Sequence, residues 1–243
     1  MVLRSRGAGR SPQLGLALVA MCLSGSAGAT TLVVDSRTEI YQAGGNPVGG
    51  SFNGGIDPVP FTFSAGAGKT LTFSSIQGVL DCDGAGSICP QSGPEGNLGG
   101  GVVLAAQGDL SGIGFRGSFS TPLLGVFLGT GLPSGPPPAL DFQNAENFAT
   151  LSPLVGQVFW VGDGLVGTGS GNPHSFVVPD TATRLFLGFY DPQAADNTGQ
   201  ATAEFSIIPE PGTGVMVVLG ALIVAGAARG RARDAGMTRT PRS

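Results

Sequence analysis

Short apolar runs, separated by glycine, proline and small polar residues, recur along most of the chain. Several runs alternate apolar and polar positions with a period of two, as half-buried β-strands do. No stretch of the central region shows a convincing 3.6-residue period, which would indicate amphipathic helices. We therefore expect an all-β domain over residues 30–208, with roughly nine strands near residues 31–34, 59–63, 70–73, 101–105, 124–128, 157–161, 175–178, 184–190 and 203–207.

The number and spacing of these strands favour a β-sandwich or jelly roll. The 179 residues of the central region suffice for one domain with its own core, and no linker divides them. Residues 132–140 contain four prolines and cannot form a central strand, so we expect a surface loop there.

The N-terminal segment has the three parts of an export signal. Its basic region holds Arg4, Arg6 and Arg10, and a short apolar stretch over residues 14–23 follows. Ala27-Gly28-Ala29 matches the small-residue site that signal peptidase cuts, with Thr30 as the first mature residue. We predict a signal peptide over residues 1–29, and hence export through the inner membrane.

The C-terminal segment also has three parts. Pro209-Glu210-Pro211 comes first and is unsuited to helix because both prolines restrict the backbone. An apolar run over residues 212–228 follows, near the lower length limit for a transmembrane helix. The run is closed by a basic cluster, Arg229, Arg231 and Arg233, which favours the cytoplasmic side, and residues 234–243 form a polar tail.

This order of tripeptide, apolar helix and arginines resembles the PEP-CTERM sorting signal of Gram-negative bacteria that build an exopolysaccharide matrix. The resemblance implies a signal over residues 209–233. An exosortase would cut near the tripeptide and deliver the protein to the cell surface or extracellular matrix. The alternative is an ordinary membrane anchor that is retained.

The charge of the central region differs from that of its flanks. The whole chain has a formal charge of −4, but residues 30–208 hold four basic and 14 acidic residues, a charge of −10. Because phosphates would be repelled by such a domain, nucleic acid is not an expected partner. Neutral sugars and cations are compatible with it.

Two cysteines remain in the mature chain, Cys82 and Cys89. In an oxidising periplasm this spacing favours a local disulfide. A zinc site is the weaker interpretation, because His174 is the single histidine and four good ligands cannot be assembled.

A second resemblance covers most of residues 30–208 and is sharpest from Gln157 onward. The strand 157–161 running into Gly162-Asp163-Gly164, the two strands around Pro179, and Asp196-Asn197-Thr198-Gly199 before the last strand are similar to the calcium-dependent galactose-binding lectins of bacteria, the PA-IL-like β-sandwich. The resemblance implies calcium ligands at Asp191, Asp196 and Asn197, with a backbone oxygen near Cys82, and a sugar contact at Asn97. Calcium prefers such oxygen donors. The alternative is that these residues only form turns, as Asp and Asn often do.

The remaining polar residues suggest no enzyme. His174 lies in a predicted surface loop without a nucleophile motif, and Asp81 with Asp83 lies in a loop expected to be solvated. Trp160 is expected in the core rather than at a sugar site. Two functions stay open: a structural protein of the envelope or biofilm matrix, associated with exopolysaccharide, and a calcium-dependent carbohydrate-binding lectin.

Overall fold

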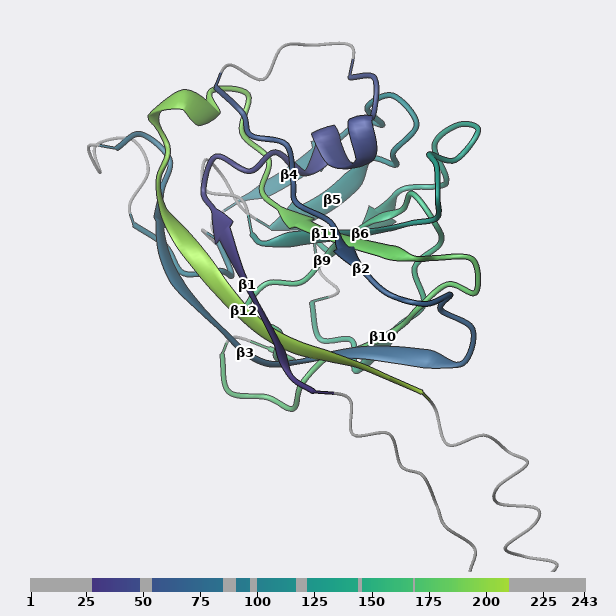
Figure 1. The fold of residues 1–243 in the computed structure, drawn as a ribbon. Coiled ribbons are helices and arrows are strands. Elements are labelled where there is room, and N and C mark those ends of the chain that lie inside the picture. The colour runs from purple at the N-terminus through teal and green to yellow at the C-terminus, as the bar shows by residue number, and fades with distance from the viewer. Residues whose placement is uncertain are drawn as a thin grey trace, which may run out of the picture.

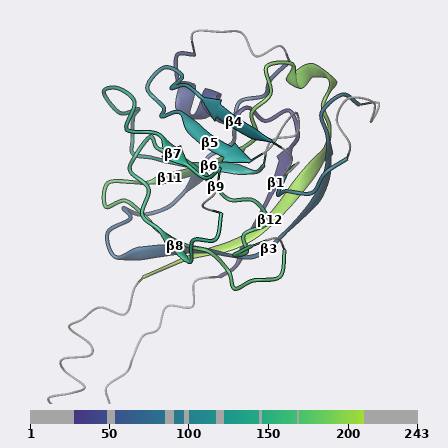
Figure 2. The same ribbon diagram turned by 180° about the vertical axis from the view of Figure 1, so that it is seen from behind.

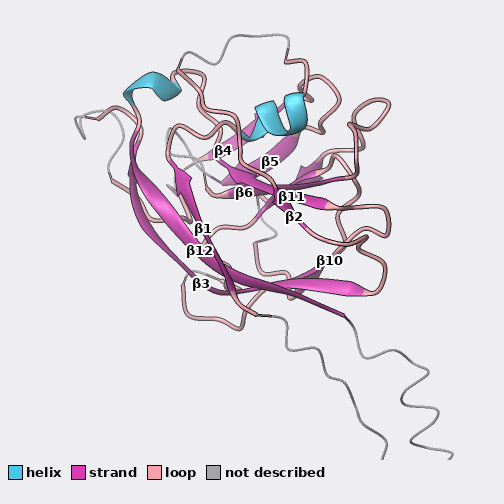
Figure 3. Cartoon of the chain, viewed as in Figure 1, coloured by secondary structure: helices cyan, strands magenta, loops and turns pink. Residues whose placement is uncertain are grey.

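The structure, a computed structural model, describes residues 28–48, 54–84, 91–96, 100–116, 122–143, 146–167 and 169–209. Within these ranges the chain consists of strands and loops with two short 3-10 helices, η1 (Ile40–Gly45) and η2 (Ala194–Asp196) (Figures 1 and 3). The predicted all-β class is confirmed.

Twelve strands are present in the described ranges, and nine of them overlap the apolar runs found in the sequence. The other three, β5 (Ile113–Arg116), β7 (Leu140–Asp141) and β8 (Thr150–Leu151), were not predicted. They hold two to four residues each, which is too short for a period-two pattern to show. The proline-rich stretch is a loop as predicted up to residue 139, and its last residue begins β7.

The largest sheet has five strands in the order β1-β12-β3-β10-β8. Its centre is the antiparallel pair of β3 (Lys69–Asp81) and β12 (Thr198–Pro209), which extends from Asp81 opposite Thr198 to Lys69 opposite Pro209. One bulge interrupts the pair, between Glu204 and Phe205. β1 (Thr30–Asp35) pairs with β12 and forms one edge, and β10 (Ser175–Val177) joins the other side of β3.

A second sheet has the order β2-β11-β6-β9, and a third has the order β4-β5-β7. In the second sheet β6 (Leu124–Leu128) is buried along its whole length between β11 (Arg184–Gly188) and β9 (Val158–Trp160). β2 (Phe61–Thr62) forms one edge of this sheet, and β4 (Gly101–Leu104) forms one edge of the third sheet. Figure 2, the view from behind, brings β4 and β5 to the front.

Side chains of the first two sheets share one core. Phe205 of β12 meets Phe61 of β2 edge to face, with 5.0 Å between ring centroids. Phe176 of β10 lies 5.0 Å from Phe159 of β9. Such aromatic pairs remove large apolar areas from water, which is the main force holding sheets together.

The two ends of the large sheet differ in what they carry. β1 begins at Thr30 and β12 ends at Pro209, and both lie at the same end of the sheet, the lower end in Figure 1, because Thr30 is opposite Phe205. We call this the tail end. η2 and the start of β12 lie at the opposite end, which we call the loop end. The 12 residues of β12 separate the two ends by on the order of 35 Å.

Candidate functional site

The loop between β11 and β12 brings two predicted calcium ligands together. The Gln193 backbone N–H donates a hydrogen bond of 2.8 Å to Asp191 Oδ1, so the aspartate closes an Asx turn. The chain then makes the single turn of η2, after which the Asn197 N–H donates to the Ala194 carbonyl at 3.2 Å. The fold of this loop follows from local hydrogen bonds and returns the chain toward Asp191.

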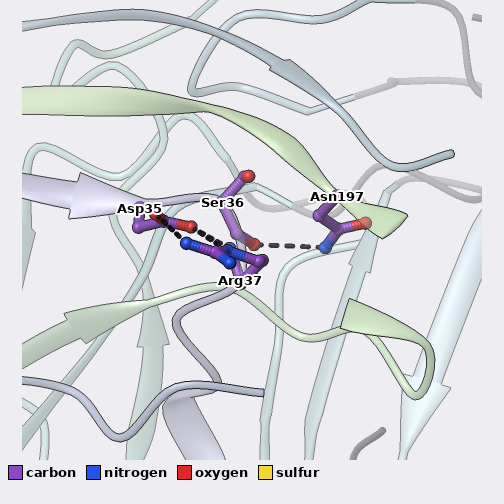
Figure 4. Close-up of polar contacts among 4 residues, drawn as sticks. All are labelled: Asp35, Ser36, Arg37 and Asn197. Carbon is purple, nitrogen blue, oxygen red and sulfur yellow. Dashed lines mark hydrogen bonds and ion pairs between the residues drawn. The ribbon is translucent and has the colours of Figure 1, made fainter. Parts of the chain in front are cut away.

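Asn197 is only 7 % exposed and is held between two strands. Its Nδ2 group donates a hydrogen bond of 3.1 Å to the Ser36 carbonyl, directly after β1 (Figure 4). Its Oδ1 atom and the Ser36 hydroxyl oxygen are both buried without a hydrogen-bond partner in the structure. A buried polar atom of this kind costs free energy unless water or an ion satisfies it.

Asp191 lies beside this amide and is half-buried. Burial raises the pKa of the Asp191 carboxyl group, and the negative charge of Asp196 raises it further. Hydrogen bonds from the Gln193 N–H and the Asn197 side chain act in the opposite direction and lower this pKa. Asp196 itself is exposed. A repulsive pair of carboxylates beside a buried amide oxygen is an arrangement that a cation would relieve.

The sequence did not single out Glu39, which lies beneath this loop and is fully buried. Its two carboxylate oxygens accept hydrogen bonds from the Tyr41 N–H at 3.3 Å and from the Asp191 N–H at 2.9 Å. Burial raises the pKa of Glu39 to about 8. No sequence signal identifies it, because Glu39 and Asp191 are far apart along the chain and meet only through the fold.

The oxygen atoms gathered at this loop supply some, but not all, of the ligands that a hard cation requires. Among the described residues no group of three or more His, Cys, Asp and Glu side chains could hold a metal ion. Calcium, however, also takes amide, backbone and water oxygens, in a total of six to eight. Asp191, Asp196 and the Oδ1 atom of Asn197 would supply the side-chain oxygens. The segment containing Cys82 is close, since a Cβ added at Gly84 would lie 2.8 Å from the Asp196 carbonyl oxygen.

Most other predicted site residues lie outside the described ranges. These are Ala27, Cys89, Asn97, Glu210, Pro211, Arg229, Arg231 and Arg233. Ala29 is exposed just before β1, and Pro209 is the last residue of β12. Cys82 is disulfide-bonded, and its pairing with Cys89 stays a prediction. No helix in the described part of the chain is long and apolar enough to cross a membrane, and the apolar run 212–228 falls outside that part.

Two expectations about polar loop residues were wrong. His174 is not on the surface but 2 % exposed, because its ring stacks on Phe148 at 4.0 Å and one ring nitrogen, Nδ1, lies 2.6 Å from the Phe148 carbonyl oxygen. Burial lowers its pKa. Asp81 is not solvated either, since it ends the central strand β3 and is buried there. Trp160 is buried in the core, as expected.

A second carboxylate with a raised pKa, on the partly buried Glu95, was also missed. Glu95 Oε1 accepts a hydrogen bond of 2.9 Å from the Asp163 N–H, and Asp163 Oδ1 accepts one of 2.8 Å from the Leu165 N–H. Burial, with the neighbouring Asp163, raises the pKa of Glu95 to about 8. These bonds hold the turn after β9.

The chain matches no protein-family model, no curated protein and no solved structure. Its function is therefore inferred from its residues and their geometry.

Proposed function

We propose that this chain is an exported, non-enzymatic protein of the bacterial envelope or biofilm matrix, associated with exopolysaccharide. Signal peptidase would remove residues 1–29, and an exosortase would process the signal over residues 209–233. The domain between them would be a β-sandwich made by the two larger sheets.

The observation that supports this proposal best is the position of the two terminal strands. β1 and β12 are neighbours in one sheet, and the residues next to both predicted processing sites, Thr30 and Pro209, lie at the tail end. A domain attached there would present its loop end on the order of 35 Å away from the attachment. This is a suitable geometry for a protein that is first anchored at a membrane and then contacts material outside the cell.

The test is expression of the full chain in a Gram-negative host with an exosortase and in the same host without it. We expect mass spectrometry to find Thr30 as the N-terminus in both hosts, and loss of the 212–243 segment only where the exosortase is present. Replacing Pro209, Glu210 and Pro211 together by alanine should block the second cut and leave the first intact. Full-length protein in the cytosol with both ends uncut would contradict the proposal.

A second candidate function, a calcium-dependent carbohydrate-binding lectin, is favoured by one observation. The Asn197 Oδ1 atom is buried without a partner beside the Asp191 carboxylate. A calcium ion held there would satisfy that oxygen and reduce the repulsion between Asp191 and Asp196. A sugar could then bind through its hydroxyl groups to the exposed side of the ion.

Calcium titration of the purified full chain tests this second function. We expect the melting temperature to rise with calcium and to return to its starting value with chelator, and a glycan array should show chelator-sensitive binding. Asp191→Ala should abolish both responses, whereas Asp180→Asn, an exposed change elsewhere, should preserve them. Stabilisation by calcium without glycan binding would mean that the ion has a structural role only. No stabilisation at millimolar calcium would mean that Asp191, Asp196 and Asn197 form a turn and bind no ion.

A further inference from the structure

A groove runs beside β1, at the edge of the large sheet. It has a volume of about 150 Å³ and opens between β1 and the segment Ile56–Val59. Its floor includes Val34 and Leu187, which are buried core residues of the two larger sheets. The groove is therefore a lateral opening into the space between these sheets.

Exposed apolar side chains concentrate at this opening. Val33 is 55 % exposed, Ile56 is 38 % exposed and Val59 is 69 % exposed, and all three line the groove. Among the described residues only four other large apolar side chains are comparably exposed, and none of them lines this groove. Apolar groups gathered around one opening are a feature that contact surfaces share.

The backbone of β1 offers hydrogen bonds at the same place. The Ser36 N–H donates to the Gly199 carbonyl, so the even-numbered residues of β1 bond to β12. The backbone N–H and C=O groups of Thr31 and Val33 consequently point away from β12, toward the open edge. The segment across the groove pairs with the chain just beyond β1, where the Ile56 N–H donates to the Arg37 carbonyl. Farther along it contains Pro58 and Pro60, which lack N–H groups.

The acidic residues at the groove favour a partner that carries basic side chains. Asp35 and Asp57 lie at its polar end. Asp35 forms a bidentate pair with Arg37, with Nε at 2.9 Å and Nη2 at 2.8 Å, whereas Asp57 has no ion pair among the described residues. The domain as a whole is strongly acidic, so a partner with basic residues is attracted and a second acidic copy is repelled.

We propose that the β1 edge and its groove bind an extended peptide segment of another protein, with alternating apolar and basic side chains, which adds to the sheet as an antiparallel strand next to β1. Backbone bonds to Thr31 and Val33 would supply affinity. Apolar side chains in the groove beside Val33 and Val59, and a basic side chain near Asp57, would supply selectivity. Ser36, next to Asp35 of the groove, is bonded to Asn197, but the proposed peptide binding does not require calcium.

A second copy of the chain fits this edge less well. An antiparallel β1–β1 pair would point the two tail ends in opposite directions, because each tail end lies at the start of its own β1. Two copies still attached to one membrane through their tail ends, before the exosortase cut, could not adopt that arrangement. A dimer is therefore an alternative outcome of the test rather than the proposal.

The test measures the fluorescence anisotropy of labelled decapeptides with the full-length chain in a neutral detergent, with micelles alone as the blank. The first peptide alternates valine and lysine, the second has the same sequence with alternate backbone amides methylated, and the third alternates valine and glutamate. We expect only the first to bind, and salt should weaken its binding. Equal binding of the methylated peptide, or no binding of any of the three, would overturn the proposal.

Variants of β1 and of the groove make the test specific. Val33→Pro removes an outward N–H while leaving the β1–β12 ladder intact, and should weaken binding at least about tenfold. If it fails to fold by circular dichroism, Val33→Lys replaces it and repels the basic peptide. Asp57→Asn should weaken binding and its salt dependence, and Asp180→Asn should change neither. Light scattering that shows a dimer lost on Val33→Pro would assign the edge to a second copy instead.

Discussion

The interior contains two regions of opposite chemistry. Beneath the large sheet, between its strands and those of the second sheet, phenylalanine rings pack on one another, with Phe61, Phe73 and Phe205 as one group. At the loop end, buried polar groups take over: Glu39 accepts two backbone N–H bonds, and Asn197 reaches across to Ser36.

The two regions differ in how their side chains contribute to stability. Apolar packing has no required direction and gains from area and close fit, so it carries most of the stability. Buried polar groups stabilise the fold only when every polar atom has a hydrogen-bond partner. At the loop end, Ser36 Oγ and Asn197 Oδ1 have none in the structure. We infer that the first region holds the fold together and that the second positions a loop that can still take a ligand.

The largest effect is expected in the apolar region. Phe205→Ala removes a buried ring that lies 5.0 Å from Phe61 and 5.7 Å from Phe73, and should lower the free energy of unfolding by about 3–5 kcal/mol. Urea denaturation followed by circular dichroism measures the change. Ile208→Ala, on the exposed side of the same strand, is the control and should cost less than about 1 kcal/mol. Similar losses of unfolding free energy for both variants would contradict the claim that the buried aromatic group carries most of the stability.

A smaller loss is expected at the loop end. Asn197→Ala leaves the Ser36 carbonyl without its side-chain donor and should cost about 1–2 kcal/mol without calcium. With calcium the difference from the unmodified chain should widen, because the variant loses a proposed ligand. A difference that stays constant over the calcium titration would show that Asn197 only connects the two strands.

The pH dependence of the free energy of unfolding should report the carboxylates whose pKa rises on folding. The pKa of Glu95 rises from 4.5 to about 8 on folding, mainly through burial. Between these values the folded chain binds more protons than the unfolded chain, so stability should fall as pH rises from about 5 to 8. After allowance for partial exposure, we expect Glu95 to account for about 1–2 kcal/mol of this fall. Denaturation at a series of pH values should show a flatter profile for Glu95→Gln, and an unchanged profile would contradict the assignment.

The smallest effect is expected at the surface. The Arg37 side chain is 43 % exposed, and its guanidinium, through hydrogen bonds, lowers the pKa of Asp35. Arg37→Ala should raise the pKa of Asp35, as NMR titration would show, with little change in melting temperature because exposed ion pairs are screened by water and salt. A large drop in melting temperature would mean that this pair also supports the groove beside β1.

The candidate site was partly predictable from the sequence. Asp191, Asp196 and Asn197 lie within one loop, and the turn-forming chemistry of Asp and Asn marks such loops directly. Glu39 and Ser36 carry no comparable signal. Ser36 reaches this place only when β1 pairs with β12, and Glu39 only when its segment pairs with Phe189 after β11. His174 was misplaced for a related reason: Asn172 and Pro173 predicted a loop, but sequence does not reveal that Phe148 packs over the histidine ring.

The sequence by itself determined the all-β class and nine of the strands, because alternation of apolar and polar positions is a local property of the chain. It also determined the contrast between basic flanks and an acidic centre, which is a matter of counting charges. Only the tertiary structure decided that both terminal strands share one end of a sheet, that Glu39 lies under Asp191, and that β1 borders an apolar groove. These depend on which strands pair, and strand order is set by the collective burial of side chains far apart along the chain.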